Sequence, residues 1–319
     1  MLSIQNLSHT YANGTQALTD VSLEIGHGMF GLLGPNGAGK STLMRCIATL
    51  QTASSGTITF GDIDVSRQPA KLRAQLGYLP QDFGVYPRVS AIDLLDHLAV
   101  LKGVAERGRR QEMVEHLLQQ VNLWAERKKA VAGYSGGMRQ RFGIAQALIN
   151  DPQLIIVDEP TAGLDPEERN RFNNLLVEIG ENVVVILSTH IVDDVTDLCQ
   201  RMAILAGGRI VASGEPKALI AGQQGRVWSR AVDKTELARS QAQWRVIATR
   251  LREGRPVIHV EADACPGAGF EPVQATLEDV YFSQLTAQRI AAAAAAGAGA
   301  VAGAVVGAAG ASTTTSSAA

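Results

Sequence analysis

The stretch GPNGAGKS, Gly34–Ser41, decides the fold of this chain. It has the pattern G-x-x-x-x-G-K-[ST], in which Gly34, Gly37 and Gly39 let the backbone wrap a phosphate chain with its N–H groups pointing inward. Lys40 can reach the β- and γ-phosphates of a nucleotide, and the Ser41 hydroxyl can bind Mg²⁺. The residues around the stretch predict a strand before it and a helix after it, which is the context that such a loop requires.

Two adjacent carboxylates follow a short apolar run further along the chain, in LIIVDEP at Leu154–Pro160. A continuous apolar run is typical of a central strand in a parallel sheet. Asp158 at its end can hold Mg²⁺ through water, and Glu159 can polarise the water that attacks the γ-phosphate. With the phosphate loop upstream, the pair predicts the second half of a nucleotide site.

A third motif, YSGGMRQ at Tyr134–Gln140, lies shortly before this strand in the sequence. Ser135, Gly136 and Gly137 come just before a predicted helix. Their backbone and hydroxyl groups therefore predict a second anion site at a helix N-terminus.

Strand and helix patterns alternate over most of the chain, which predicts a mainly parallel sheet with helices on both faces. The first residues predict short strands around a turn at Asn13-Gly14, and residues 90–127 read as mostly helical. Pro166–Ile179 predicts a helix, and VVVILSTH after it predicts a second buried strand.

A second, smaller unit follows this pattern. Within residues 226–285 the sequence predicts strands at 246–251 and 256–261 and helices near 235–241 and 277–285, hence a small α+β domain. Its residues 226–263 carry eight basic and five acidic side chains, which fits a solvated surface or contact with anionic lipid.

In their order along the chain, these motifs resemble those of the nucleotide-binding subunit of an ABC transporter, over about residues 1–220. Four further positions match: Tyr11 ahead of the loop, Gln81 in LPQDF, GLD at Gly163–Asp165 and His190 in LSTH. The resemblance implies that Tyr11 stacks on adenine, that Gln81 contacts Mg²⁺ and the attacking water, and that His190 contacts the γ-phosphate. It also assigns nucleotide contacts to these residues: Pro35, Asn36, Ala38, Thr42 and Asp165.

The resemblance implies an α/β fold of the P-loop NTPase class. An ABC cassette at residues 1–222 would combine a RecA-like core, an antiparallel β subdomain and a helical subdomain at about 88–132. A small accessory domain at 226–285 and an Ala/Gly-rich, low-complexity tail at 286–319 would follow.

The resemblance also implies partners. Two subunits, expected to be a homodimer, would bind two ATP molecules head to tail, each ATP held by the loop of one subunit and the SGG motif of the other. Separate membrane permease subunits would place the chain at the cytoplasmic face of the membrane. The GMRQR continuation and the ending ATLEDVYFSQL, Ala275–Leu285, resemble ATPases of ABC-2 type exporters. The family motif is most often LSGGQ, and Met138 here lacks the polar contact that glutamine would make.

Composition limits the alternatives. With 29 Lys+Arg against 31 Asp+Glu the net charge is −2, which argues against binding of nucleic acid through bulk positive charge. Three scattered cysteines predict neither a disulfide framework nor a zinc site, and the start has no signal-peptide pattern. Two alternatives remain. One is a soluble ABC ATPase of DNA repair or translation, but such proteins usually carry a coiled-coil insertion or a second cassette, and this sequence shows neither. The other is a regulatory ABC protein that binds ATP without turnover, and the presence of Glu159 and His190 argues against it.

The Ala/Gly-rich tail has two interpretations. Gly299, Gly303 and Gly307 have the spacing of close-packed membrane helices. However, glycine disfavours a helix and few strongly apolar side chains lie here. We therefore expect a disordered tail.

Overall fold

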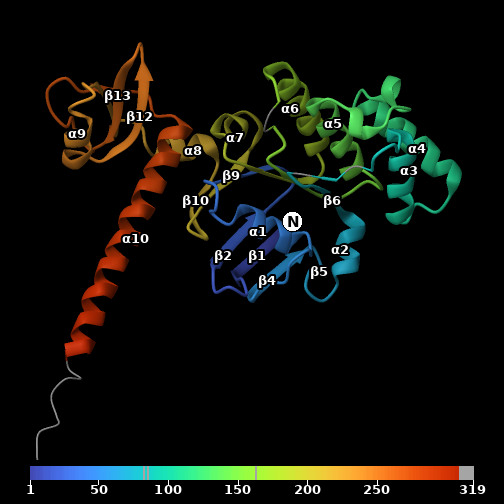
Figure 1. Cartoon of the computed structure of the whole chain (residues 1–319), viewed down its shortest axis with the longest axis horizontal. Coiled ribbons are helices and arrows are strands. Elements are labelled where there is room, and N and C mark those ends of the chain that lie inside the picture. Colours follow the sequence, from blue (N-terminus) through green and yellow to red (C-terminus); the bar gives the residue numbers. More distant parts are fainter. Residues whose placement is uncertain (82, 85, 162–163, 309–319) are drawn as a thin grey trace, which may run out of the picture. The chain divides into compact units, whose positions relative to one another are not determined.

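The computed structural model describes residues 1–81, 83–84, 86–161 and 164–308. Its contacts divide the chain into two units, residues 1–222 and a second unit from Gln223 onward (Figure 1).

A six-stranded, mainly parallel sheet forms the centre of the first unit. Neighbouring strands from β9 to β6 run parallel, and β10 pairs antiparallel with β9. Every residue of β7 and β8 is buried, as the continuous apolar runs predict. The strands, in sheet order, are β10 (Arg209–Gly214), β9 (Arg201–Ala206), β3 (Gly28–Leu33), β8 (Val184–Thr189), β7 (Leu154–Asp158) and β6 (Leu76–Leu79).

The two faces of this sheet are covered differently. Phe30 and Leu32 of β3 belong to the core shared with α1 (Lys40–Ile47). The alternate residues face α6 (Pro166–Gly180) and α7 (Val192–Leu198), where a Cβ on Gly31 would lie 2.7 Å from Val195.

An antiparallel sheet shares the core on the α1 side. Its order is β2 (Gln16–Ile25), β1 (Leu2–Thr10), β4 (Ser55–Phe60) and β5 (Ile63–Asp64). The turn predicted at Asn13-Gly14 joins β1 to β2, with Gly14 at a φ of 84°. One face of the central sheet therefore packs on a helix together with a second sheet, rather than on helices alone.

A helical part extends from the β6 side of this unit (Figure 1). It contains α3 (Ala91–Leu101), α4 (Arg107–Gln120) and α5 (Gly136–Ala147), which pack on one another. Two 3₁₀ turns, Trp124–Glu126 and Val131–Gly133, link α4 to α5. Two short helices complete the unit: α2 (Pro69–Gln75) and α8 (Pro216–Ala221).

The second unit is an antiparallel sheet with helices. Its strand order is β12 (Val246–Arg252), β13 (Arg255–Glu261), β11 (Val227–Ala231) and β14 (Glu271–Pro272). The helices are α9 (Leu237–Gln243) and α10 (Leu277–Ala308). The sequence predicted β12 and β13 but not β11, because β11 is mostly half-buried and lacks a clear apolar alternation.

The expectation of a disordered tail is wrong for residues 286–308, which continue α10. A helix that has already begun at Leu277 adds residues without a new nucleation cost, and alanine is the best helix former. Residues 309–319 of the expected tail lie outside the described residues. Within the described part of the chain, none of the helices is both long and apolar enough to span a bilayer.

Candidate nucleotide site

The loop between β3 and α1 is built around two glycines with positive φ. Gly37 has a φ of 79° and Gly39 a φ of 108°, values that favour glycine. A Cβ on Gly39 would lie 2.5 Å from the Ala17 carbonyl oxygen, so a side chain has no room there. Within the loop, the Ala38 N–H donates to the Pro35 carbonyl. The backbone thus turns tightly just before α1 begins.

Lys40, the first residue of α1, places a buried ammonium at this loop. Its side chain is 5% exposed, and Nζ donates to the Gly34 carbonyl at 2.7 Å. Nζ also lies 3.5 Å from Glu159 Oε1. Burial lowers the pKa of Lys40, while the negative charges of Glu159 and Asp158 oppose this shift.

Three side chains of the site contact the Glu159 carboxylate. Besides Lys40, it contacts His190, whose Nδ1 lies 3.2 Å from Oε1. Gln81 Nε2 donates to Glu159 Oε2 at 3.3 Å. These residues come from four separate segments of the sequence, each at the carboxyl end of a central strand or just beyond it, where ligands of parallel sheets bind.

Asp158 and Ser41 are the candidate ligands of a metal ion. Asp158 is 4% exposed, and no residue in the described part of the chain donates a hydrogen bond to its buried Oδ1. Ser41 is exposed in the first turn of α1. Among the described residues, no group of three or more His, Cys, Asp and Glu side chains is arranged so that it could hold a metal ion by itself. One carboxylate and one hydroxyl fit Mg²⁺, which in phosphate sites takes its other ligands from water and phosphate.

Tyr11 lies next to α1, not far from the loop. Its hydroxyl is hydrogen-bonded to Thr42 Oγ1 at 2.9 Å, and its ring meets that of His9 edge-on. The bond to Thr42 holds the hydroxyl end of the tyrosine beside α1, and sequence reasoning did not foresee it.

The SGG motif lies on different elements. Ser135 caps α5, and its Oγ accepts a hydrogen bond from the Met138 N–H. Gly136 is exposed, whereas Gly137 is buried and a Cβ there would lie 2.5 Å from Glu168 Oε2. α5 packs mainly on β6, α3, α4 and α6, whereas α1 packs mainly on β2 and β7.

The GLD motif has a structural role as well. Asp165 caps α6, and its Oδ1 accepts the Glu168 N–H at 2.8 Å, followed by Pro166 in the first turn. Gly163, the first residue of this motif, lies outside the described residues. Asn36, the remaining predicted contact, is exposed in the phosphate loop.

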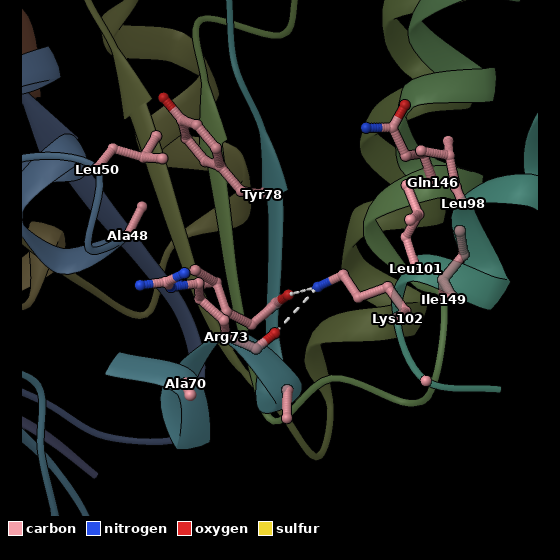
Figure 2. A pocket seen from close by; sticks show the side chains of 13 residues that line it. Ala48, Leu50, Ala70, Arg73, Tyr78, Leu98, Leu101, Lys102, Gln146 and Ile149 are labelled. Atoms are coloured by element: carbon pink, nitrogen blue, oxygen red, sulfur yellow. Dashed lines mark hydrogen bonds between the residues drawn. The ribbon is translucent and has the colours of Figure 1, made fainter. Parts of the chain in front are cut away.

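A mainly apolar cavity of about 560 Å³ opens between the central sheet and the helical part (Figure 2). Leu50 and Leu101 at its wall are 63% and 70% exposed. Lys102 reaches across it, and its Nζ donates to the Leu76 carbonyl at 2.5 Å and to the Arg73 carbonyl at 3.2 Å. Burial lowers the pKa of Lys102. Sequence reasoning missed this cavity, because its lining comes from distant parts of the chain: the segment after α1, the consecutive elements α2 and β6, and the helices α3 and α5 with the residues that follow them.

Comparison with known proteins gives consistent similarities. The ABC transporter family profile matches residues 18–162. The chain is 38% identical to the phosphonates import ATP-binding protein PhnC of Chromohalobacter salexigens, over 69% of this chain and 86% of that protein. It is 34% identical to the Nod factor export ATP-binding protein I of Cupriavidus metallidurans, over 69% and 73%. A solved structure described as a dimeric bacterial ABC transporter cassette, MJ0796, matches with a TM-score of 0.61 and 26% identity, covering 67% of this chain and 98% of that one.

Proposed function

This chain belongs to the ABC transporter family as an ATP-binding ATPase subunit, and we propose that it powers substrate export through a separate ABC-2 type permease. The observation that carries the ATPase part of the proposal is the convergence of Lys40, Gln81 and His190 on the Glu159 carboxylate. A carboxylate in such surroundings suits a general base for ATP hydrolysis.

We propose the following roles, which the geometry of the site supports. The loop N–H groups and Lys40 bind the phosphates, and Glu159 takes a proton from the attacking water. His190 orients Glu159 and contacts the γ-phosphate. Ser41, Asp158 and Gln81 would hold Mg²⁺, which when bound neutralises phosphate charge.

We further propose that two copies bind two ATP molecules between them. Ser135 caps a helix that packs mainly on elements other than those around α1. This supports a site in which the phosphate loop of one subunit meets the SGG motif of the other. The similarity to a cassette described as dimeric also favours this arrangement.

The cavity near Lys102 is our candidate for the permease contact. An apolar wall with exposed Leu50 and Leu101 suits a partner's apolar side chains. Its floor includes the start of β6, and Gln81 follows the end of that strand. The contact would continue along residues 81–87, of which Asp82 and Val85 lie outside the described residues.

Export is the finer part of the proposal. Relatives named for import and for export match over similar shares of the chain. The segment Ala275–Leu285, which resembles the ending of ABC-2 exporter ATPases, favours export. In this arrangement residues 1–222 form the cassette, residues 226–285 an accessory domain and residues 286–319 a tail, at the cytoplasmic face of the membrane.

The decisive experiment is to isolate the full chain from its native membrane under mild conditions and to identify what accompanies it. A polytopic membrane protein of the ABC-2 permease type, whose removal abolishes efflux of a compound, would support the proposal. Nucleic acid or ribosomes in its place would support the alternative of a soluble ABC ATPase.

A further inference from the structure

Two buried oxygen atoms near the nucleotide site find no hydrogen-bond partner within the described part of the chain. They are Oγ of Ser188, on β8, and Oδ1 of Asp158, on β7. Ser188 is 0% exposed and Asp158 is 4% exposed. Native proteins normally supply such oxygens with a partner, often an ordered water.

The register of the sheet puts these two residues next to each other. Asp158 pairs with Ser188 across β7 and β8, and Ser188 pairs with Leu32 across β8 and β3. Neighbouring strands lie about 4.8 Å apart, a separation that one water can bridge with two hydrogen bonds of about 2.8 Å.

Both side chains face the phosphate loop. Ile156 and Ile186, two residues earlier on β7 and β8, belong to the core that contains α1. Because alternate residues of a strand point to the same face, Asp158 and Ser188 point to the α1 side as well. The phosphate loop begins directly after Leu33 on the neighbouring strand β3.

The main chain of Ser188 already positions the other carboxylate of the pair. Its carbonyl oxygen accepts the Glu159 N–H at 2.8 Å. Glu159 has a φ of 48°, a strained conformation that this bond helps to hold.

We propose that Ser188 is a positioning residue for the Mg²⁺ of the nucleotide site, and this inference rests on the proposed ATPase function. The Ser188 hydroxyl and Asp158 Oδ1 share one water, which becomes a ligand of Mg²⁺ when the nucleotide binds. A hydroxyl can both donate and accept, so it fixes the orientation of that water and of the carboxylate. The simpler interpretation is that serine is only a small residue that fits a crowded strand.

The test measures metal affinity rather than turnover. The full-length Glu159→Gln protein, saturated with ATP, is titrated with Mn²⁺ in place of Mg²⁺, and free Mn²⁺ is followed by electron paramagnetic resonance. Ser188→Ala should weaken Mn²⁺ binding about tenfold, as loss of an outer partner of a metal ligand typically does. ATP affinity without metal and the melting temperature should stay as in the parent.

Two further variants make the result specific. Ser188→Thr keeps a hydroxyl on a strand and should restore Mn²⁺ affinity to within about threefold of the parent. In an Asp158→Asn background, Ser188→Ala should add less than about a twofold loss, because residues that act through one shared water are not additive. Ser240→Ala, at a buried serine of the second unit, is the matched control and should change nothing.

Mn²⁺ affinity that is unchanged in Ser188→Ala would overturn the inference, as would an equal loss of metal-free ATP affinity. A parent protein that binds neither ATP nor Mn²⁺ would instead contradict the proposed ATPase function itself, so the two failures are distinguishable.

Discussion

At the scale of single residues, Glu159 combines a strained backbone with a crowded carboxylate. A non-glycine residue in the left-handed region costs about 1–3 kcal/mol, and such residues collect at functional sites. Here the conformation turns the chain after β7 so that the carboxylate meets Lys40 and His190. The backbone conformation of Glu159 therefore places its carboxylate in the site but lowers the stability of the folded chain.

Glu159→Gln should reduce ATP hydrolysis by about 10²-fold or more, the usual scale for loss of a general base. The amide has the same shape, so ATP affinity should stay within about threefold of the wild type. Steady-state phosphate release and nucleotide binding on the purified chain measure the two effects. Glu167→Gln, at an exposed glutamate of α6, is the control, and wild-type turnover in Glu159→Gln would refute the assignment of the base.

Lys40→Ala should weaken ATP binding by about tenfold to a hundredfold, because a hydrogen bond to a charged group contributes about 1.5–3 kcal/mol. The remaining loop N–H groups do not replace the positive charge next to the phosphates. Isothermal titration calorimetry with ATP measures the change, with Lys217→Ala at an exposed lysine as control. Equal affinities of the two variants would contradict the phosphate-loop assignment.

At the scale of elements, the motif TLEDVY turns out to hold α10 on its sheet. The Asp279 carboxylate is fully buried and accepts hydrogen bonds from Thr276 N and Oγ1, which form a cap at the start of α10. His259 Nδ1 on β13 lies 2.7 Å from Asp279 Oδ1. Burial acts to raise the pKa of Asp279, but the hydrogen bonds from His259 and Thr276 outweigh it, so the pKa is lowered.

Asp279→Ala should destabilise the second unit by about 3 kcal/mol, because it leaves the buried His259 without its partner. Hydrogen exchange of the amides at residues 277–285 in the full chain measures this directly. Asp263→Ala, at an exposed aspartate of the same unit, should leave the exchange unchanged. Slow exchange in Asp279→Ala would show that apolar packing alone holds α10.

The same carboxylate predicts a pH dependence of folding. Because its folded pKa is lowered, the stability it contributes is complete above the unfolded value of about 3.9 and is lost as the pH falls through the folded value. Acid unfolding of residues 277–285, followed by exchange between pH 5 and 2, should therefore begin below about pH 4 in the wild type. Asp279→Asn should remove this transition.

At the scale of the whole molecule, we expect two copies of the chain to form a dimer that depends on ATP. With ATP bound but not hydrolysed, Glu159→Gln should accumulate as a dimer. Adding Ser135→Arg should return it to a monomer, because a large side chain would fill the space that the phosphates need across the interface. Size-exclusion chromatography with light scattering, with and without ATP, reads the mass. Ser66→Arg, at an exposed serine, is the control, and a dimer that survives Ser135→Arg would contradict the head-to-tail arrangement.

The permease contact is tested on the cavity wall. Leu101→Asp should reduce recovery of the permease with the chain by about tenfold or more, since burial of a leucine side chain contributes about 1.5–3 kcal/mol. ATP affinity should not change. Val177→Asp, at a partly exposed valine of α6, is the matched control, and equal recovery of the permease with both variants would place the contact elsewhere.

Much of the fold was readable from the sequence because its signals are local. The buried strands β7 and β8 appear as apolar runs, and Gly37 and Gly39 mark a turn that only glycine permits. The sequence also predicted the residues of the candidate site, since each motif has its own spacing. By contrast, the sequence analysis missed β11, because this strand forms by pairing with strands that lie far away in the chain. It also missed the helical continuation to Ala308, because that segment extends a helix that begins upstream at Leu277.

The sequence by itself therefore determined the family to which the chain belongs, and it predicted the phosphate loop and the two adjacent carboxylates of the site. Only the tertiary structure decided that Lys40, Gln81 and His190 meet on Glu159, and that Ser188 lies beside Asp158 on the same face of the sheet. The physical reason is strand order: β3, β8 and β7 are neighbours in space but not along the chain. Register and pleat, which depend on long-range pairing, then fix which side chains share a face.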